Sequence, residues 1–216
     1  MSMATTDLEM IRKLSKDIRT ASKTLSNQEA RYLVDTYYNL QDFRKATGNQ
    51  IRALNSSEEP NESIQFFFEQ FNTLEKSVKS VLEIYVKQHD VGNWCLSITG
   101  IGPVITAGLM AHIDIEKAPT VGHIWSYAGL VPGQKWEKGQ KRPWNAKLKV
   151  LCWKIGQSFV KVHNNEKDDF GKVYKARKEL EIQKNESGEY AEQAAAILAA
   201  KKFNPETEAY KQYSQG

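Results

Sequence analysis

The chain has 216 residues, enough to bury a hydrophobic core as one domain or as a small domain with helical extensions. Its two cysteines, Cys95 and Cys152, are far apart, so neither a disulfide scaffold nor a zinc knuckle is indicated. No apolar run reaches the roughly 18 residues of a membrane span, and the first residues lack the apolar core of a signal peptide. We therefore expect a cytoplasmic protein with no membrane partner.

The net charge of +4 is too small to identify a partner, but it is unevenly distributed along the chain. Residues 91–165 contain 9 lysines and arginines against 3 acidic residues. Residues 1–90 contain 12 against 13, and residues 166–216 contain 9 against 10, so each of these segments has a net charge of −1. The basic excess therefore belongs to the middle of the chain.

Residues 1–90 have the apolar spacing of helices. One stretch runs from Leu8 to Leu25 and a second begins at Asn27, until Asn55–Asn61 breaks the pattern. After the break, apolar residues from Ile64 to Tyr85 alternate at spacings of three and four, which is a heptad seam. A seam needs a partner. It packs either against the earlier helices of the same chain or, through residues 61–88, against a second copy in a coiled-coil homodimer.

The segment Leu96–Leu109 has the residue order of a helix-hairpin-helix. Gly100 and Gly102 flank Ile101, which allows a tight turn with positive φ and a close approach of main-chain amides to a ligand. Pro103 suits the first position of a helix whose N-terminus favours a phosphate. A dinucleotide-binding loop is disfavoured, because Ile105 stands where its third glycine is needed. The remaining alternative is a turn between packed helices that binds nothing.

A second turn, Tyr127–Gly133, follows a short helix around Val121 and Trp125, and a basic loop over residues 134–144 comes next. The helix after the loop has an apolar side, and Lys147, Lys154 and Lys161 share another side that we expect to lie along a duplex. Lysines and Arg142 alternate with tryptophans here, a mixture suited to phosphate contacts and base stacking. The alternative is a solvated basic face. The tryptophans are Trp136, Trp144 and Trp153.

The rest of the chain reads as a helical extension. A mixed-charge helix is interrupted near Ser187, an alanine-rich helix runs from Tyr190 to Lys202, and a polar tail follows. The fold class predicted from the whole sequence is mainly α. Its expected parts are a helical region over residues 1–90, a helix-hairpin-helix domain over residues 91–165 and an extension over residues 166–216.

The motifs in the middle of the chain occur together in one known family. Ile98-x-Gly-Ile-Gly-x-Val-x-x-Ala107, then Tyr127-Ala-Gly-Leu-Val-Pro132, then a basic loop and Asn145-x-x-Leu-x-x-Leu-x-Trp153 resemble the C-terminal domain of bridge-RNA-guided bacterial insertion-sequence transposases. The resemblance covers residues 91–163, and the family also places a coiled coil before this domain. It implies nucleic-acid binding and a role in recombination or transposition.

Two departures from the family bear on catalysis. The family's N-terminal domain holds four metal-binding acidic residues on a strand-containing fold, whereas residues 1–90 here offer no alternating strands. The family's catalytic serine belongs to a Ser-Gly pair, and the corresponding loop here reads Trp136-Glu-Lys-Gly139. No serine occurs between Tyr127 and Gln157. The resemblance therefore implies binding more than strand cleavage, and we expect no catalytic residue.

Other site chemistries have weaker patterns. Ser126, His123 and Asp114 could form a nucleophilic triad, but no nucleophile elbow surrounds the serine. His112 and His123 are potential metal ligands, although the histidines and cysteines are scattered singly. Asp114 and Glu116 are more commonly turn caps than ligands of a divalent ion. We therefore predict no metal and no cofactor.

The sequence predicts a nucleic-acid-binding protein that contacts the DNA backbone and recognises the shape of the DNA largely without reading its sequence. The expected form is branched or single-stranded DNA. A protein bound to DNA in this way would be associated with the nucleoid. Structured RNA is the related alternative. A second hypothesis is a structural or adaptor protein of a phage or mobile element, and a third is a recombinase subunit whose partner supplies the missing carboxylates. The predicted contact residues are Gly100, Ile101, Gly102, Val104, Lys135, Lys138, Lys141, Arg142, Trp144, Lys147 and Lys149.

Overall fold

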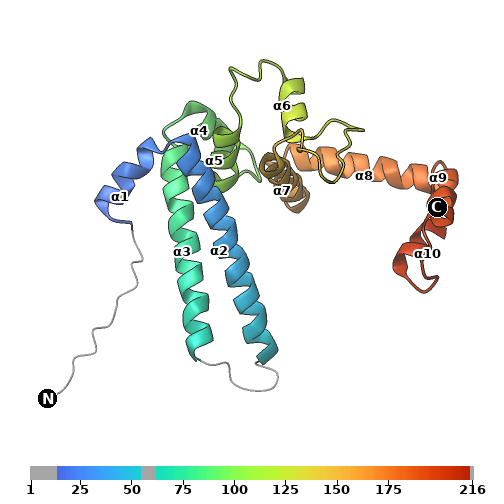
Figure 1. The fold of residues 1–216 in the computed structure, drawn as a ribbon, viewed down its shortest axis with the longest axis horizontal. Coiled ribbons are helices and arrows are strands. Elements are labelled where there is room, and N and C mark those ends of the chain that lie inside the picture. Colours follow the sequence, from blue (N-terminus) through green and yellow to red (C-terminus); the bar gives the residue numbers. More distant parts are fainter. Residues whose placement is uncertain (1–13, 55–61, 215–216) are drawn as a thin grey trace. The chain divides into compact units, whose positions relative to one another are not determined.

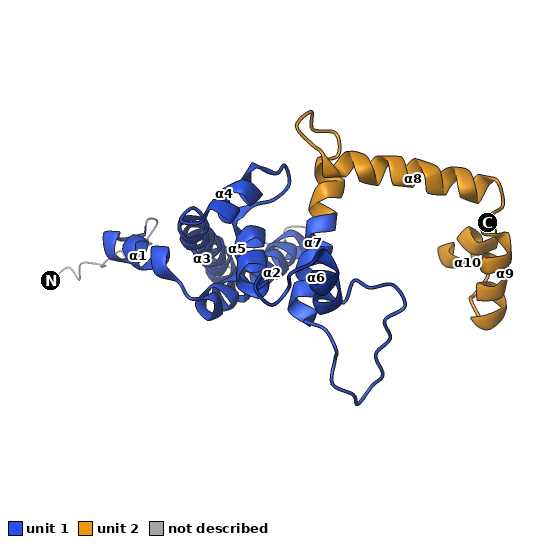
Figure 2. Ribbon diagram, turned by 90° about the horizontal axis from the view of Figure 1, so that it is seen from above, with its two compact units in different colours: residues 1–156 blue, residues 157–216 orange. Residues whose placement is uncertain are grey.

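The computed structural model describes residues 14–54 and 62–214. Over these residues the chain forms α-helices, one short 3₁₀ turn (Ser22–Thr24) and loops, with no β-strand, so the predicted mainly α-helical fold class is confirmed. The chain divides into two compact units, residues 1–156 and residues 157–216 (Figure 2). The boundary falls inside helix α7 (Ala146–Val162).

A long helical hairpin begins unit 1. After the short helix α1 (Lys16–Ala21), helix α2 (Asn27–Leu54) and helix α3 (Glu62–Val86) lie side by side (Figure 1). Part of the seam of α3, including Val78 and Tyr85, packs in the core with α2 of the same chain, whereas Phe67 and Leu74 of the seam remain exposed. The start of the first predicted helix, from Leu8 to Lys13, and the break at Asn55–Asn61 lie outside the described residues.

Two shorter helices, α4 (Asp90–Ser97) and α5 (Pro103–His112), close the core of the hairpin. The sequence of α5 is apolar on all sides, which suits a helix surrounded by others. Its buried residues Val104, Ala107 and Ala111 meet Val34 of α2 and Leu82 of α3 in one cluster. The turn that contains Gly100 and Gly102 therefore leads directly into a helix of the main core of unit 1.

Helices α6 (Val121–Ala128) and α7 add a second, smaller cluster around Ala128, Leu148 and Leu151. The contact between α5 and α7 is very close at Gly108, where an added Cβ would lie 2.7 Å from Leu151 Cδ2. Any larger residue at Gly108 would force the Leu151 side chain to move. Helix α5 therefore sets the position of the start of α7.

Unit 2 contains the rest of the described chain. Helix α8 (Phe170–Glu186) ends before Gly188, as the sequence predicts, and α9 (Ala191–Ala200) follows. The segment expected as a polar tail contains a further helix, α10 (Glu208–Ser214), which contacts α9. The start of α8 is capped by Asp168, whose fully buried side chain accepts a hydrogen bond from the Gly171 amide at 2.9 Å.

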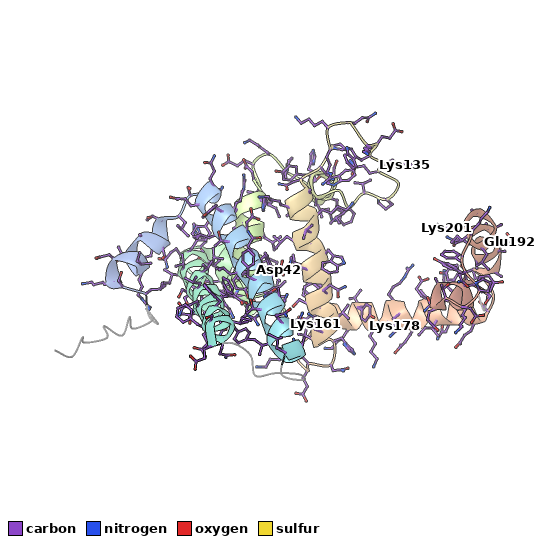
Figure 3. The ribbon with its side chains drawn as sticks, turned by 60° about the horizontal axis from the view of Figure 1, so that its bottom comes forward. Asp42, Lys135, Lys161, Lys178, Glu192 and Lys201 are labelled. Carbon is purple, nitrogen blue, oxygen red and sulfur yellow. The ribbon has the colours of Figure 1, made fainter. Side chains whose placement is uncertain are left out.

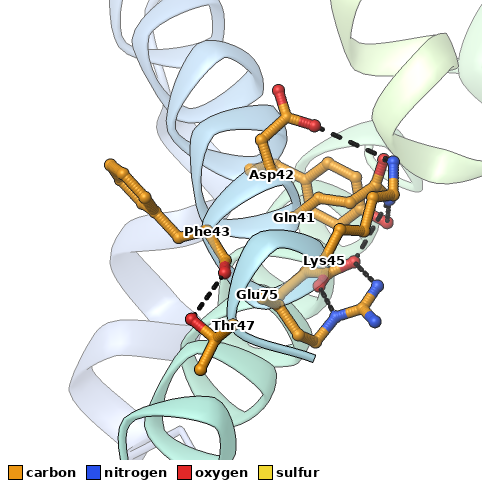
Figure 4. A network of polar contacts seen from close by, with 8 residues as sticks. Gln41, Asp42, Phe43, Lys45, Thr47 and Glu75 are labelled. Atoms are coloured by element: carbon orange, nitrogen blue, oxygen red, sulfur yellow. Dashed lines mark hydrogen bonds and ion pairs between the residues drawn. The ribbon is translucent and has the colours of Figure 1, made fainter. Parts of the chain in front are cut away.

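A charged network joins α2 to α3 halfway along the hairpin (Figure 4). The carboxylate of Glu75 is buried and accepts hydrogen bonds from Arg44 Nε at 2.5 Å and from Gln41 Nε2 at 3.2 Å. Burial by itself raises the pKa of Glu75, but the hydrogen bonds from Arg44 and Gln41 outweigh it and hold the pKa below its usual value. The network therefore stabilises the hairpin above the ordinary carboxyl pKa and loses this effect as the pH falls through the lowered pKa.

We expect Glu75→Gln to lower the free energy of unfolding by about 2 kcal/mol, because it removes the charge that Arg44 faces in a largely buried site. Urea denaturation followed by circular dichroism measures the change. The control is Glu83→Gln on the same helix, since Glu83 pairs with Lys87 at 2.6 Å with both side chains exposed. It should change stability by less than about 0.5 kcal/mol. Equal effects of the two variants would contradict the assignment.

Candidate nucleic-acid interface

A short turn joins α4 to α5 at the position of the predicted helix-hairpin-helix, and only Gly100 of its two glycines has a positive φ. Gly100 has a φ of 94°, which favours glycine, whereas Gly102 is extended at φ −104° and ψ 173°. Ile101 N–H donates to Ile98 O at 3.0 Å and closes the turn. Pro103 occupies the first turn of α5, so the remaining first-turn amides lie at the hairpin end of the helix.

Two of the predicted hairpin contacts belong to the core. The Ile101 side chain is buried, and Val104 is part of the main core cluster with Leu82 and Ala107. Their side chains therefore hold the turn in place. Any contact of these two residues with a ligand would have to come from the main chain.

The basic loop between α6 and α7 is organised around one tryptophan. Trp136 Nε1–H donates to Gln140 O at 2.7 Å, and the guanidinium of Arg142 lies 4.6 Å from the centre of its ring. Gly139, with a φ of 93°, allows the chain to reverse between them. Both side chains of this cation–π pair remain exposed.

The loop presents cations that have no acidic partner. Lys135, Lys138, Lys141 and Arg142 are exposed, and none of them forms an ion pair within the described part of the chain. Figure 3 shows Lys135 on this loop. Uncompensated surface cations attract polyanions and release counterions when they bind them.

Trp144 has a packing role at the end of the loop. Helix α6 ends at Gly129, whose φ is 68°, and an added Cβ there would lie 2.5 Å from Trp144 Cγ. The ammonium group of Lys149 lies 4.6 Å from the centre of the Trp144 ring. Trp144 is therefore held between the backbone of α6 and a lysine, while Trp136 and Trp153 are the more exposed rings.

Two of the three lysines expected on one side of α7 contact α2, whereas Lys161 is exposed and forms no ion pair in the described chain. Lys147 forms an ion pair with Asp35 of α2, and the Lys154 ammonium lies 3.6 Å from the centre of the Tyr38 ring. Burial lowers the pKa of Lys154 and raises the pKa of Tyr38 to about 12. Both lysines line a cavity of about 560 Å³ between α2 and α7. They face α2 because a carboxylate and an aromatic ring there attract them.

Asn145 links three helices, a role that the sequence analysis did not assign. Its Oδ1 accepts the Lys147 and Leu148 amides at 3.0 and 3.1 Å, which caps α7. Its Nδ2 lies 3.1 Å from His112 Nδ1 and 3.0 Å from the Tyr127 hydroxyl. An asparagine before an apolar helical pattern signals the cap, but nothing in the sequence indicates the two contacts with other helices.

The residues considered for catalysis or metal binding are bonded in other ways. Asp114, His123 and Ser126 line one cavity, yet His123 Nδ1 contacts Thr120 Oγ1 at 2.7 Å and Asp114 pairs with Lys117 at 3.1 Å. Asp114 also accepts the Glu116 amide, as expected for a turn cap. In residues 14–54 and 62–214, no three potential ligands gather at one point that could hold a metal ion.

The comparison with protein families identifies the central segment. Residues 94–168 match the model of the transposase IS116/IS110/IS902 family, which agrees with the position of the sequence resemblance. The match covers about a third of the chain and supports a transposase-like role. No curated protein and no solved structure matches the chain. Within its described residues, no helix is long and apolar enough to cross a membrane.

We expect Gly129→Ala to displace Trp144 and destabilise the α6–α7 connection. The control is Gly133→Ala, because Gly133 also has a positive φ, of 79°, but an added Cβ there meets nothing within 4 Å. The control should lose about 1 kcal/mol from backbone strain. Gly129→Ala should lose about 1–3 kcal/mol more from the clash. Urea denaturation followed by tryptophan fluorescence measures both losses, and equal losses would show that the ring can move freely.

The imidazole of His112 should make stability depend on pH. Burial, together with the charges of Arg31 and Lys147, lowers its pKa in spite of the opposing charge of Asp35. The folded state therefore favours the neutral ring. Stability is complete above the ordinary histidine pKa and falls as the pH drops below it towards the lowered value. Urea denaturation at pH 7.5 and 5.5 should show a larger loss for the wild type than for His112→Gln. The same loss in both would contradict the assignment.

Proposed function

We propose that this protein binds nucleic acid as part of a transposase-like machinery, in recombination, transposition or the DNA metabolism of a phage or mobile element. The observation that carries the proposal is the set of unpaired cations on residues 135–142, inside the segment that matches a transposase family. Four cations within eight residues, with Glu137 as the one acidic residue among them, make a local positive surface that a polyanion would neutralise, whereas Lys147 and Lys154 of α7 already contact Asp35 and Tyr38.

The proposed binding mode is contact with the sugar-phosphate backbone. The main-chain amides of Gly102 and Val104 would meet phosphates, since the Ile101 amide already donates to Ile98 O and Pro103 has no N–H. Lys135, Lys138, Lys141 and Arg142 would replace counterions. Trp136 lies in the same loop and would stack on an unpaired base at a junction, fork or single strand. The expected preference is for the shape of the nucleic acid, with branched or single-stranded DNA as the main candidate and structured RNA as the related one. Lys147 and Lys149 would contribute charge near the loop, but they are held by Asp35 and Trp144.

A second candidate function is that of a protein-binding adaptor, which exposed apolar side chains on α2 and α3 favour. Phe43, Phe66, Phe67 and Leu74 are exposed, and the Phe43 ring stacks on Phe71 at 5.5 Å between ring centres. Exposed aromatic groups of this kind occur at protein interfaces. A second copy of the chain, packed through residues 61–88, would cover Phe66, Phe67 and Leu74 and form the homodimer that the heptad pattern allows.

Charge reversal in the loop tests the nucleic-acid proposal. Fluorescence anisotropy would measure binding to duplex, single-stranded and four-way-junction DNA and to hairpin RNA over a salt series. We expect Lys141→Glu with Arg142→Glu to weaken binding and to reduce the slope of log K against log salt by about 2 on duplex DNA, because two phosphate contacts are lost.

The matched control is Lys175→Glu with Lys178→Glu on α8. Both lysines are exposed and form no ion pair in the described chain, so the control makes the same change in net charge. Equal losses in the two variants would mean that net charge alone drives binding. No binding of the wild type at low salt would reject the nucleic-acid proposal. Concentration-dependent association in that case would favour the adaptor or homodimer.

A further inference from the structure

A second cavity touches the basic loop at Pro143, but none of the cations of that loop lines it. It has a volume of about 500 Å³ and lies between α2, the connection from α5 to α6, and α6 itself. Its polar lining includes Arg31, His112 and Tyr127, and its apolar lining includes Ile113 and Ile124. None of the residues predicted to contact nucleic acid lines this cavity. Its size is within the range of pockets that hold small ligands.

The amide of Asn145 determines which groups of this cavity donate hydrogen bonds. Because Asn145 Oδ1 accepts the two amides of the α7 cap, the atom that faces His112 and Tyr127 is the Nδ2 donor. His112 Nδ1 therefore accepts a hydrogen bond, which places the ring proton of the neutral imidazole on Nε2. The Tyr127 oxygen also accepts, which leaves its own hydrogen to donate. Among the described residues, neither His112 Nε2–H nor the Tyr127 O–H has an acceptor.

Arg31 adds a fixed positive charge to the same cavity. Its Nε donates to Ala111 O at the end of α5, at 2.7 Å. No carboxylate pairs with its guanidinium in the described chain, so the terminal N–H groups remain without an anion. The acidic residue of the lining, Asp114, is neutralised by Lys117 at 3.1 Å. The cavity thus combines an unpaired cation with two oriented neutral donors.

We propose that this cavity binds the phosphate of a nucleoside monophosphate, with Arg31, His112 Nε2–H and the Tyr127 hydroxyl as donors to its oxygens. A phosphate dianion only accepts hydrogen bonds, the Arg31 guanidinium only donates, and the contacts with Asn145 leave His112 Nε2–H and the Tyr127 O–H available to donate. Ile113, Ile124 and Pro143 provide an apolar wall for the sugar or base. The phosphate belongs either to a free nucleotide or to the 5′ end of a nucleic-acid strand. None of the cations of the basic loop is among the proposed phosphate donors.

Calorimetric titration of the purified chain tests the site with adenosine 5′-monophosphate and with adenosine. We expect the monophosphate to bind at least about tenfold more tightly than adenosine, since the phosphate makes charge-assisted hydrogen bonds. Tyr127→Phe and Arg31→Gln should each weaken monophosphate binding about tenfold. The Lys141→Glu, Arg142→Glu variant should bind it as the wild type does, which separates failure of this site from failure of the basic loop. Equal binding of monophosphate and adenosine, or no effect of Tyr127→Phe in a folded variant, would overturn the proposal.

Two further measurements identify the source of the phosphate and test the positioning role of Asn145. A preference for a 5′-phosphorylated oligonucleotide over its 5′-hydroxyl form supports a strand end, whereas binding of the free nucleotide without that preference supports a free ligand.

¹⁵N NMR of the His112 ring should show the proton on Nε2 in the wild type. Asn145→Ser keeps a helix cap but removes the amide donor, so it should disturb this tautomer and weaken monophosphate binding. A wild-type ring protonated on Nδ1 would contradict the donor arrangement.

Discussion

The packing of α5 is the constraint on which the rest of unit 1 depends. This ten-residue helix touches α2 and α3 through Val104, Ala107 and Ala111, and it meets α7 at Gly108. Small residues allow these close approaches, and each one limits what can replace it. One end of α5 begins at the hairpin turn and the other ends at His112. The turn of residues 100–102 thus precedes one end of α5, and His112 of the proposed nucleotide cavity lies at the other end.

The central segment has a net charge of +6, but its cations fall into two groups. Lys147 and Lys154 contact Asp35 and Tyr38 and so contribute to the fold. The cations of residues 135–142 have no acidic partner in the described chain and contribute to the surface potential. The charge that attracts a polyanion is thus smaller and more local than the composition indicates.

Features with a local cause could be predicted from the sequence. The periodicity of α2, α3 and α7 and the start of α5 at Pro103 depend on nearby residues, and the structure has them all. The turn predicted over Tyr127–Gly133 begins later than expected, because α6 continues through Ala128 and ends at Gly129. Contacts between distant residues could not be predicted in this way. Helical spacing shows that Lys147 and Lys154 share a side of α7, but it does not show which helix that side faces. The same limit applies to Asn145. Its capping of α7 is a local feature that the sequence indicates, but its contacts with His112 and Tyr127 join distant parts of the chain and could not be predicted.

The Arg142 guanidinium already covers one face of the Trp136 ring, on which the proposed binding mode would stack a nucleobase. An exposed cation–π contact is worth about 0.5–1 kcal/mol, so an incoming base competes with a side chain of the protein itself and loses about two- to fivefold in affinity. When no base is bound, the same arginine covers part of the Trp136 ring and so limits its nonspecific apolar contacts. When a base displaces it, the guanidinium becomes available to a phosphate at that moment. Stacking and charge neutralisation in this loop would then occur together, as one exchange of partners.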